Sequence, residues 1–296
     1  MIARWPTGQT CRLILLHDLL FIAPTMKQQS KHRGLMERAG RPGSLSDRLP
    51  GLVELDRTSF PRWRDRIARA EAEHEAGGGV PALPRGYPGH PWWQLPRVRR
   101  RVRPSLDSAL TQRRSTRELA TVMLPISVLA RLLWFGHGAH LPTDVHAGGP
   151  RGPVPSAGGL QALELYLAIF ESGWLPAGFF HYDRVQHGLA LVAPAVTRLE
   201  CERDLVPALA TVAGGAFLWI LVGDGARVQH KYGERAARFL VLEAGHLMQN
   251  LCLLSSSLGL ATVPLGGFYE RALASHLALL PGDLVLYAGV CGKLRA

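Results

Sequence analysis

The chain has 296 residues, of which 47% are apolar, so it can fill a sizeable hydrophobic core and disorder throughout is excluded. Its 34 Lys and Arg residues outweigh 23 Asp and Glu residues and give a net charge of +11, but the surplus is local, with arginines crowded between residues 97 and 117. Arginine pairs well with phosphate. Without interleaved aromatic residues or a zinc module, however, the patch does not indicate a nucleic-acid-binding protein.

The N-terminus resembles a signal peptide only in part. Arg4 and Arg12 precede the apolar run 13–22, but His17 and Asp18 interrupt this run and no small-residue cleavage site follows cleanly. No other stretch reaches the roughly 18 uninterrupted apolar residues of a membrane-spanning helix. The four cysteines are far apart and form no C-x-x-C pair, which fits a reducing compartment. We therefore expect a cytoplasmic protein without a membrane span.

The segment from residue 27 to about residue 96 is rich in arginine, glycine and proline, which predicts a partly disordered arm and linker. Trp92 and Trp93 lie at its end, and we expect them to dock on the rest of the chain because two exposed indoles would leave a costly apolar patch. The sequence thus divides into a variable arm and linker, 1–83, and a domain, 84–296. The compact part of that domain is expected to begin near Pro104.

Beyond Pro104 the hydrophobic pattern predicts helices and strands in irregular alternation. Ser105 can cap a short helix, and Pro125 can open a second one. The absence of a regular β-α-β rhythm favours an α+β fold over a doubly wound sheet. The expected strands are 163–169, 179–182, 189–192, 216–222, 261–265 and 284–290, and the later expected helices are a long central one, 227–258, ended by Gly259, and a short one, 269–279.

Three short segments could bind a ligand. Residues 113–117, Arg-Arg-Ser-Thr-Arg, place three guanidinium groups and two hydroxyls after a short helix, which suits a phosphate ester. The glycine loops at 155–159 and 265–268 would let a flat ligand approach the backbone closely. Each segment taken alone could also be an ordinary solvated turn. Together they indicate a ligand with an anionic tail and a planar head.

Six motifs, in matching order and spacing, resemble the SagB-type branch of the nitroreductase family, the peptide azoline dehydrogenases. The resemblance covers residues 84–296 and implies a three-layer α-β-α sandwich with a long central helix, which forms an intertwined homodimer with FMN at the subunit interface. The motifs are Arg-Arg-Ser-x-Arg at 113–117, Pro-Ser-Ala-Gly-Gly-Leu at 155–160, Phe-His-Tyr-Asp at 180–183, Lys-Tyr-Gly at 231–233, Glu-Ala-Gly-His-Leu-x-Gln-Asn at 243–250 and Gly-Leu-Ala-Thr-Val-Pro-Leu-Gly-Gly at 259–267.

The resemblance also implies roles by position. The arginine-rich turn would hold the FMN phosphate and ribityl chain, the loop 155–159 would close over the ring from the partner subunit, and Gly266 and Gly267 would present amides near the flavin N5 and O4 edge. Lys293 is the late basic candidate for the phosphate. The implied cofactor-binding residues are Arg113, Arg114, Ser115, Arg117, Pro155, Ser156, Ala157, Gly158, Gly159, Gly266, Gly267 and Lys293.

Lys231 and Tyr232 bear most directly on the reaction, because azoline dehydrogenases of this type use a Lys-Tyr pair at the corresponding point. Oxidation of a thiazoline or oxazoline removes a proton from carbon alpha and a hydride from carbon beta, and a lysine beside the phenol would favour the phenolate base. FMN would take the hydride and molecular oxygen would reoxidise it. An ordinary Lys-Tyr at a helix start is the alternative.

Three other sequence patterns are weaker indications of a functional site. Glu243, His246 and Asn250 share a helix face. About 22 Å of helix separates Lys231 from His246, so we expect this row to lie apart from the site. We expect it to form buried hydrogen bonds rather than a metal site. Gly223-Asp224-Gly225 lacks the third glycine of a dinucleotide fingerprint. The histidines at 137, 140 and 146 are expected at the surface or in a substrate cleft.

The sequence leaves three functions open. The first is FMN-dependent oxidation of azolines in a ribosomally synthesised peptide, in partnership with a cyclodehydratase that residues 1–83 could contact. The second is an NAD(P)H-dependent reductase of nitro compounds or quinones on the same fold. The third is a binding or scaffold protein that has lost turnover. In all three, neither a nucleic acid nor a membrane is an expected partner.

Overall fold

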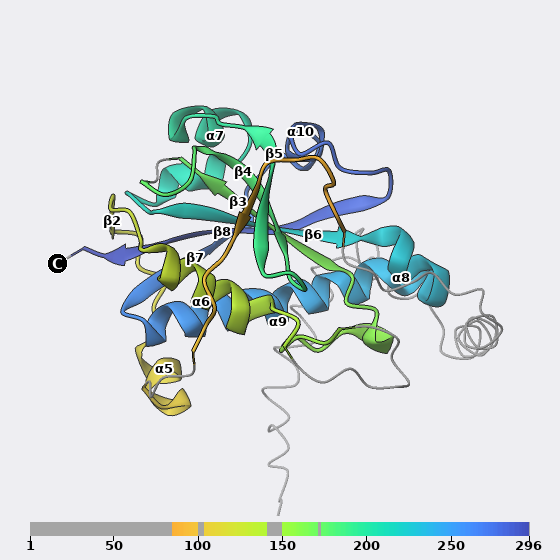
Figure 1. Cartoon of the computed structure of the whole chain (residues 1–296), viewed down its shortest axis with the longest axis horizontal. Coiled ribbons are helices and arrows are strands. Elements are labelled where there is room, and N and C mark those ends of the chain that lie inside the picture. The colour runs from red at the N-terminus through yellow and green to blue at the C-terminus, as the bar shows by residue number, and fades with distance from the viewer. Residues whose placement is uncertain (1–84, 100–103, 141–149, 171–172, 296) are drawn as a thin grey trace, which may run out of the picture. The chain divides into compact units, whose positions relative to one another are not determined.

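The computed structural model describes residues 85–99, 104–140, 150–170 and 173–295. An eight-stranded sheet forms the middle layer, with strand order β1-β5-β4-β3-β6-β8-β2 and β7 paired with β8 (Figure 1). All its pairings are antiparallel. The strands are β1 (Trp92–Gln94), β2 (Leu119–Ala120), β3 (Leu163–Ile169), β4 (Gly178–Asp183), β5 (Gly188–Pro194), β6 (Phe217–Asp224), β7 (Leu260–Leu265) and β8 (Asp283–Leu294).

Helices cover both faces of the sheet, which gives the expected three-layer α-β-α arrangement (Figure 1). One layer holds α5 (Leu106–Gln112), α6 (Ile126–His137), α8 (Gly225–Tyr232) and α9 (Ala236–Ser257). The opposite layer holds α7 (Arg198–Asp204), the 3-10 helix Pro207–Thr211 and α10 (Glu270–His276). The α+β fold class inferred from the sequence is confirmed.

The core follows from strand periodicity. Alternate residues of β3 point to opposite faces, so that Leu165 and Leu167 pack in the cluster with α6 and α9, whereas Tyr166 packs in the cluster with α7 and α10. Strand β6 lies between β3 and β8 and is buried from Phe217 to Gly223. The expectation that this apolar run is a central strand buried on both faces is therefore confirmed.

Most expected elements form within a few residues of their predicted bounds. Ser105 caps α5 by accepting a hydrogen bond from the Ser108 amide, and α6 begins directly after Pro125. Helix α7 was not expected from the sequence, although Thr197 and Glu200 form a capping box at its start. It is short and buries only Cys201, so it lacks the apolar face that reveals a longer helix.

The expectation of one long central helix over residues 227–258 is wrong in one respect, because the structure has two helices there. Gly233 ends α8 with a φ of 55°, a left-handed conformation that glycine adopts without strain. A 3-10 turn, Gly233–Arg235, follows, and α9 begins at Ala236. The break changes the direction of the chain immediately after Tyr232.

The end of the linker docks as expected, but of its two indoles Trp93 is half-buried and Trp92 remains 39% exposed. Strand β1 pairs with β5 at the edge of the sheet, and the Trp93 ring meets Phe180 with centroids 5.6 Å apart. Thus the compact part of the domain begins before Pro104, contrary to expectation. Residues 1–83 and the division at residue 84 lie outside the described residues. Among the described helices, none is long and apolar enough to cross a membrane.

His137 is not at the surface or in a cleft as expected but 2% exposed, with Nε2 3.1 Å from the Leu163 carbonyl oxygen. His140 is half-buried, and position 146 lies outside the described residues. Burial, aided by the charge of Arg184, lowers the pKa of His137 to about 3. The neutral ring therefore serves as a structural hydrogen-bond donor at the end of α6.

This buried histidine predicts a loss of stability in mild acid. The unfolded chain binds a proton at His137 below pH 6.5, whereas the folded chain does not until about pH 3. Its contribution is complete above pH 6.5 and falls by up to about 1.4 kcal/mol per pH unit as the pH drops through that window. Urea unfolding of the wild type and His137→Gln across pH 3–8 should give curves that converge in acid, and parallel curves would contradict the assignment.

Candidate functional site

Helix α8 presents Lys231 and Tyr232 in its last turn. Asp224 starts the helix by accepting a hydrogen bond from the Arg227 amide at 3.0 Å, and Gly233 ends it. Tyr232 is 7% exposed, and its ring lies 4.7 Å from that of Phe239, centroid to centroid. The pair is therefore held in place by both ends of a short helix and by packing on α9.

The glycine loop 155–159 contacts this pair within the same chain. Gly158 has a φ of 59°, and a Cβ built on it would lie 2.6 Å from the Tyr232 phenol oxygen and 3.3 Å from Lys231 Nζ. The position thus demands glycine for two reasons, its backbone conformation and the lack of space. Two motifs more than 70 residues apart in the chain form one local site.

Glu243 of α9 anchors the same loop. Its Oε1 accepts hydrogen bonds from the Ala157 amide at 2.7 Å and from Ser156 Oγ at 3.1 Å. Burial raises the pKa of Glu243, and these two hydrogen bonds oppose the shift. The expectation that its row of residues lies apart from Lys231 is wrong for Glu243, because the helix break at Gly233 allows α8 and α9 to meet the same loop.

The rest of that row is not buried. His246 is exposed and Asn250 is half-buried. Within the described ranges, no group of three or more His, Cys, Asp or Glu side chains could hold a metal ion. The described cysteines, Cys201, Cys252 and Cys291, are buried and free.

The arginine-rich turn follows α5 directly. Arg113 Nη1 lies 3.4 Å from Ser115 Oγ, and Arg114 caps the helix end through the Thr111 carbonyl at 2.7 Å. Arg113 is half-buried, whereas Ser115 and Arg117 are exposed. Arg114 is thus already engaged by the helix, while Ser115 and Arg117 present donors toward solvent.

Strand pairing brings the C-terminal end of β8 to this turn. Lys293 is exposed and lies opposite Ala120 of β2, three residues after Arg117. Arg295, which we did not expect in the site, pairs with Glu118 with 3.5 Å between Nη1 and Oε2. Arg295 follows the end of β8, two residues after Lys293, and a second basic residue so close to Lys293 is a signal in the sequence that could have identified it.

Gly266 and Gly267 follow β7 and are exposed, and a Cβ on Gly266 would meet nothing within 4 Å. The other end of β7, Leu260, pairs with Lys293. Six residues of strand therefore separate the glycines from the basic end, about 17 Å.

Comparison with known proteins adds a family to this geometry. Residues 110–293 match the nitroreductase family. The chain belongs to the nitroreductase family. A protein of Methanocaldococcus jannaschii that is named as a nitroreductase is 28% identical over 183 residues, which cover 61% of this chain and 88% of that protein.

Solved structures agree on the fold. A protein of Ralstonia eutropha JMP134, also named as a nitroreductase, is 27% identical with a TM-score of 0.59 over 74% of this chain and 96% of its own. A chain of the Escherichia coli microcin synthetase McbBCD complex, solved with truncated pro-MccB17 bound, is 20% identical with a TM-score of 0.51. That likeness covers 83% of this chain and 98% of the other and shows a shared fold.

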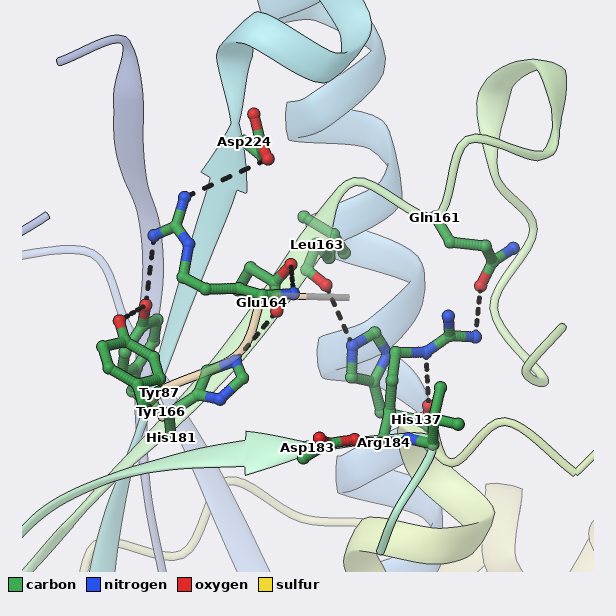
Figure 2. A network of polar contacts seen from close by, with 12 residues as sticks. Tyr87, His137, Gln161, Leu163, Glu164, Tyr166, His181, Asp183, Arg184 and Asp224 are labelled. Carbon is green, nitrogen blue, oxygen red and sulfur yellow. Dashed lines mark hydrogen bonds and ion pairs between the residues drawn. The ribbon is translucent and has the colours of Figure 1, made fainter. Parts of the chain in front are cut away.

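A buried polar network connects the nitroreductase-family region to the residues that precede it. Glu164 of β3 accepts hydrogen bonds from His181 Nε2 at 2.9 Å and Arg227 Nη2 at 3.1 Å, and Figure 2 shows Glu164 facing His181. Burial alone would raise the pKa of Glu164, but these partners outweigh it and hold the pKa at about 2. Glu164 is therefore an ionised hub that joins β3, β4 and α8.

Arg85 joins the same network from outside the residues that match the nitroreductase family. Its guanidinium group makes two 2.7 Å hydrogen bonds to Asp283 and reaches the Tyr166 hydroxyl at 3.2 Å. Tyr87 and Tyr166 share a 2.7 Å hydrogen bond between their hydroxyls (Figure 2). Arg85 and Tyr87 thus pack as part of this nitroreductase-family domain.

Proposed function

We propose that this chain is an FMN-dependent oxidoreductase that dehydrogenates thiazoline and oxazoline rings to azoles in a ribosomally synthesised peptide. The observation that carries the proposal is the contact of Lys231 and Tyr232 with the glycine loop at Gly158. A phenol and an amine beside an exposed backbone loop can remove a proton from a flat ring. A nitroreductase needs no such base.

The described residues fit FMN, a cofactor class typical of the nitroreductase family. The arginine-rich turn and Lys293 provide a cationic end suited to phosphate. Gly266 leaves open space for a planar ring about one strand length away, whereas Gly267 packs closely on Ala208. In a homodimer, residues 155–159 would cover the flavin ring that the partner subunit binds. Lys231 and Tyr232 would then face a cofactor whose phosphate the partner subunit holds.

The residues of α8 supply the acid-base chemistry in this proposal. Lys231 Nζ lies 5.9 Å from the centroid of the Tyr232 ring, close enough for its charge to favour the phenolate. Tyr232 would then accept the proton from carbon alpha of the azoline. Bound FMN supplies an acceptor for the hydride from carbon beta. Exclusion of water by the loop 155–159 would strengthen both the base and its interaction with Lys231.

A peptide substrate and a cyclodehydratase partner are part of the proposal. The microcin synthetase structure supports them, because it contains a chain of the same fold inside a multi-component complex with truncated pro-MccB17 bound. We further propose residues 1–83 as the segment that contacts a partner or the substrate peptide. Added segments outside a shared core often carry specificity.

The second candidate is an NAD(P)H-dependent reductase of nitro compounds or quinones. The names of the relatives from Methanocaldococcus jannaschii and Ralstonia eutropha favour it. Both candidates use the same flavin site, but electrons flow in opposite directions. In the first the substrate reduces the flavin, and in the second a nicotinamide does.

An absorbance spectrum of the purified protein, followed by anaerobic mixing, tests the proposal. We expect a flavin spectrum that a thiazoline peptide bleaches and NADPH does not. Bleaching by NADPH alone would favour the reductase. No flavin signal even after addition of FMN would refute both candidates and leave a binding or scaffold role.

A further inference from the structure

Gln161 has a backbone conformation that glutamine rarely adopts. Its φ is 51°, and among the described residues only two other non-glycine residues, His187 and Ala278, have a positive φ. Gln161 is 8% exposed and lies between the loop 155–159 and strand β3. Such a conformation persists only where the surroundings impose it, and it is enriched at functional sites.

Each polar group of Gln161 holds a different part of the structure. Its amide donates to Ser156 Oγ at 2.8 Å, and its carbonyl accepts from Arg227 Nη1 at 2.9 Å. Its side-chain oxygen accepts from Arg184 Nη2 at 2.7 Å, and Figure 2 shows the two side chains facing each other. The left-handed turn lets one residue make all three contacts at once.

Two of these contacts reach the two elements that meet where Gly158 lies next to Tyr232. Ser156 belongs to the glycine loop, and Arg227 lies four residues, about one turn, before Lys231 on α8. Gln161 therefore connects the loop to the helix that carries the Lys-Tyr pair.

Arg184 makes this connection rigid. It is 2% exposed, and its guanidinium group also donates to the carbonyl oxygens of His137 at 3.3 Å and Pro150 at 3.0 Å. A charged group buried among carbonyl oxygens moves at a high energetic cost, because any shift leaves donors unsatisfied. The Gln161 side chain is thus tied to a fixed point between α6 and β3.

We propose that Gln161 is a positioning residue that holds the loop 155–159 against Lys231 and Tyr232 through its left-handed backbone. Its effect on turnover rests on the proposed function. Its effect on the loop does not, because the hydrogen bonds exist in the chain without substrate.

Three substitutions separate the backbone from the side chain. Gln161→Gly keeps the left-handed backbone and removes the amide group. Gln161→Asn tolerates the same φ and retains an amide one methylene closer to the backbone. Gln161→Val disfavours a positive φ because it is β-branched, and Gln161→Ala replaces it if the valine variant does not fold.

Hydrogen exchange of the FMN-loaded protein, resolved to residues 155–161, reports on the loop without turnover. The amides of Ala157, Gly159, Leu160 and Gln161 are all hydrogen-bonded there. We expect exchange to accelerate by about tenfold or more in the valine variant. The glycine and asparagine variants should exchange close to the wild-type rate.

Flavin reduction by a thiazoline peptide then reports on positioning. A displaced loop should lower kcat by about 10²-fold in the valine variant with little change in KM, and the asparagine variant should recover most of the rate. Unchanged exchange in the valine variant would overturn the proposal. Faster exchange with unchanged kcat would also overturn it, because Gln161 would then only stabilise the loop.

Failure of the proposed function gives a different result. A wild-type protein that binds FMN but is not reduced by the peptide would refute azoline oxidation. The exchange comparison then decides the role of Gln161. Faster amide exchange of the loop in the valine variant but not in the glycine variant supports the positioning role, and equal exchange rates in the two variants overturn it.

Discussion

Tyr232→Phe is expected to slow reduction of the bound flavin by a thiazoline peptide by about 10²–10⁴-fold, the usual effect of losing a general base. The change removes one oxygen, the atom that lies next to Gly158, and keeps the ring packing on Phe239. Binding of FMN should therefore remain. Stopped-flow absorbance of flavin bleaching under anaerobic conditions measures the rate, and the flavin spectrum measures the occupancy.

Two further variants sharpen this test. Lys231→Met should slow the reaction less than Tyr232→Phe at neutral pH, and its loss should shrink as the pH rises, because in alkali the phenol ionises without help from the lysine. Tyr182→Phe removes another buried phenol oxygen, which is hydrogen-bonded to His187 in the turn between β4 and β5. It should leave the rate unchanged. A Tyr232→Phe protein as fast as the wild type would exclude Tyr232 as the base.

Arg227→Met should lower the free energy of unfolding by about 3–5 kcal/mol, the usual effect of leaving a buried charge without its partner. Arg227 is 6% exposed and binds Glu164 at 3.1 Å, Asp224 at 3.0 Å and the Gln161 carbonyl at 2.9 Å. Glu164 is itself 2% exposed at its side chain. Urea unfolding monitored by tryptophan fluorescence measures the loss, given seven tryptophans in the chain.

A second substitution and a surface control test the reason for that loss. Glu164→Gln combined with Arg227→Met should cost less than the sum of the two single changes, because the double variant leaves no unpaired charge between them. Arg203→Met, at the exposed ion pair with Asp204, should leave the unfolding free energy unchanged. Additive effects of the two buried changes would show that Arg227 acts through packing alone.

The split of the expected long helix shows where periodicity is informative and where it is not. Apolar residues recur with helical spacing across residues 227–258, and the sequence contains no proline there. Gly233 ends α8 because its backbone adopts a positive φ. Glycine occurs both inside helices and at their ends, so the sequence alone does not distinguish a tolerated glycine from a terminating one.

The Arg85 segment shows the same limit for composition. Its glycine and proline content is typical of a linker, and its composition does not indicate that Arg85 pairs with Asp283, 198 residues later. Local sequence carries no information about a partner so distant in the chain. Trp93 was informative because the burial of a large apolar ring is favourable whatever covers it, whereas Trp92 remains 39% exposed.

The amino-acid sequence alone was sufficient for the α+β class, six of the eight described strands and the residues that resemble a flavin site, because periodicity and local motifs are properties of neighbouring residues. Tertiary structure was required to show that Gly158, Tyr232 and Glu243 meet, and that Gln161 connects them. Those contacts depend on a left-handed glutamine, a helix break at Gly233 and hydrogen bonds across 66 to 87 positions. Only the folded backbone brings such distant donors and acceptors within hydrogen-bonding distance of each other.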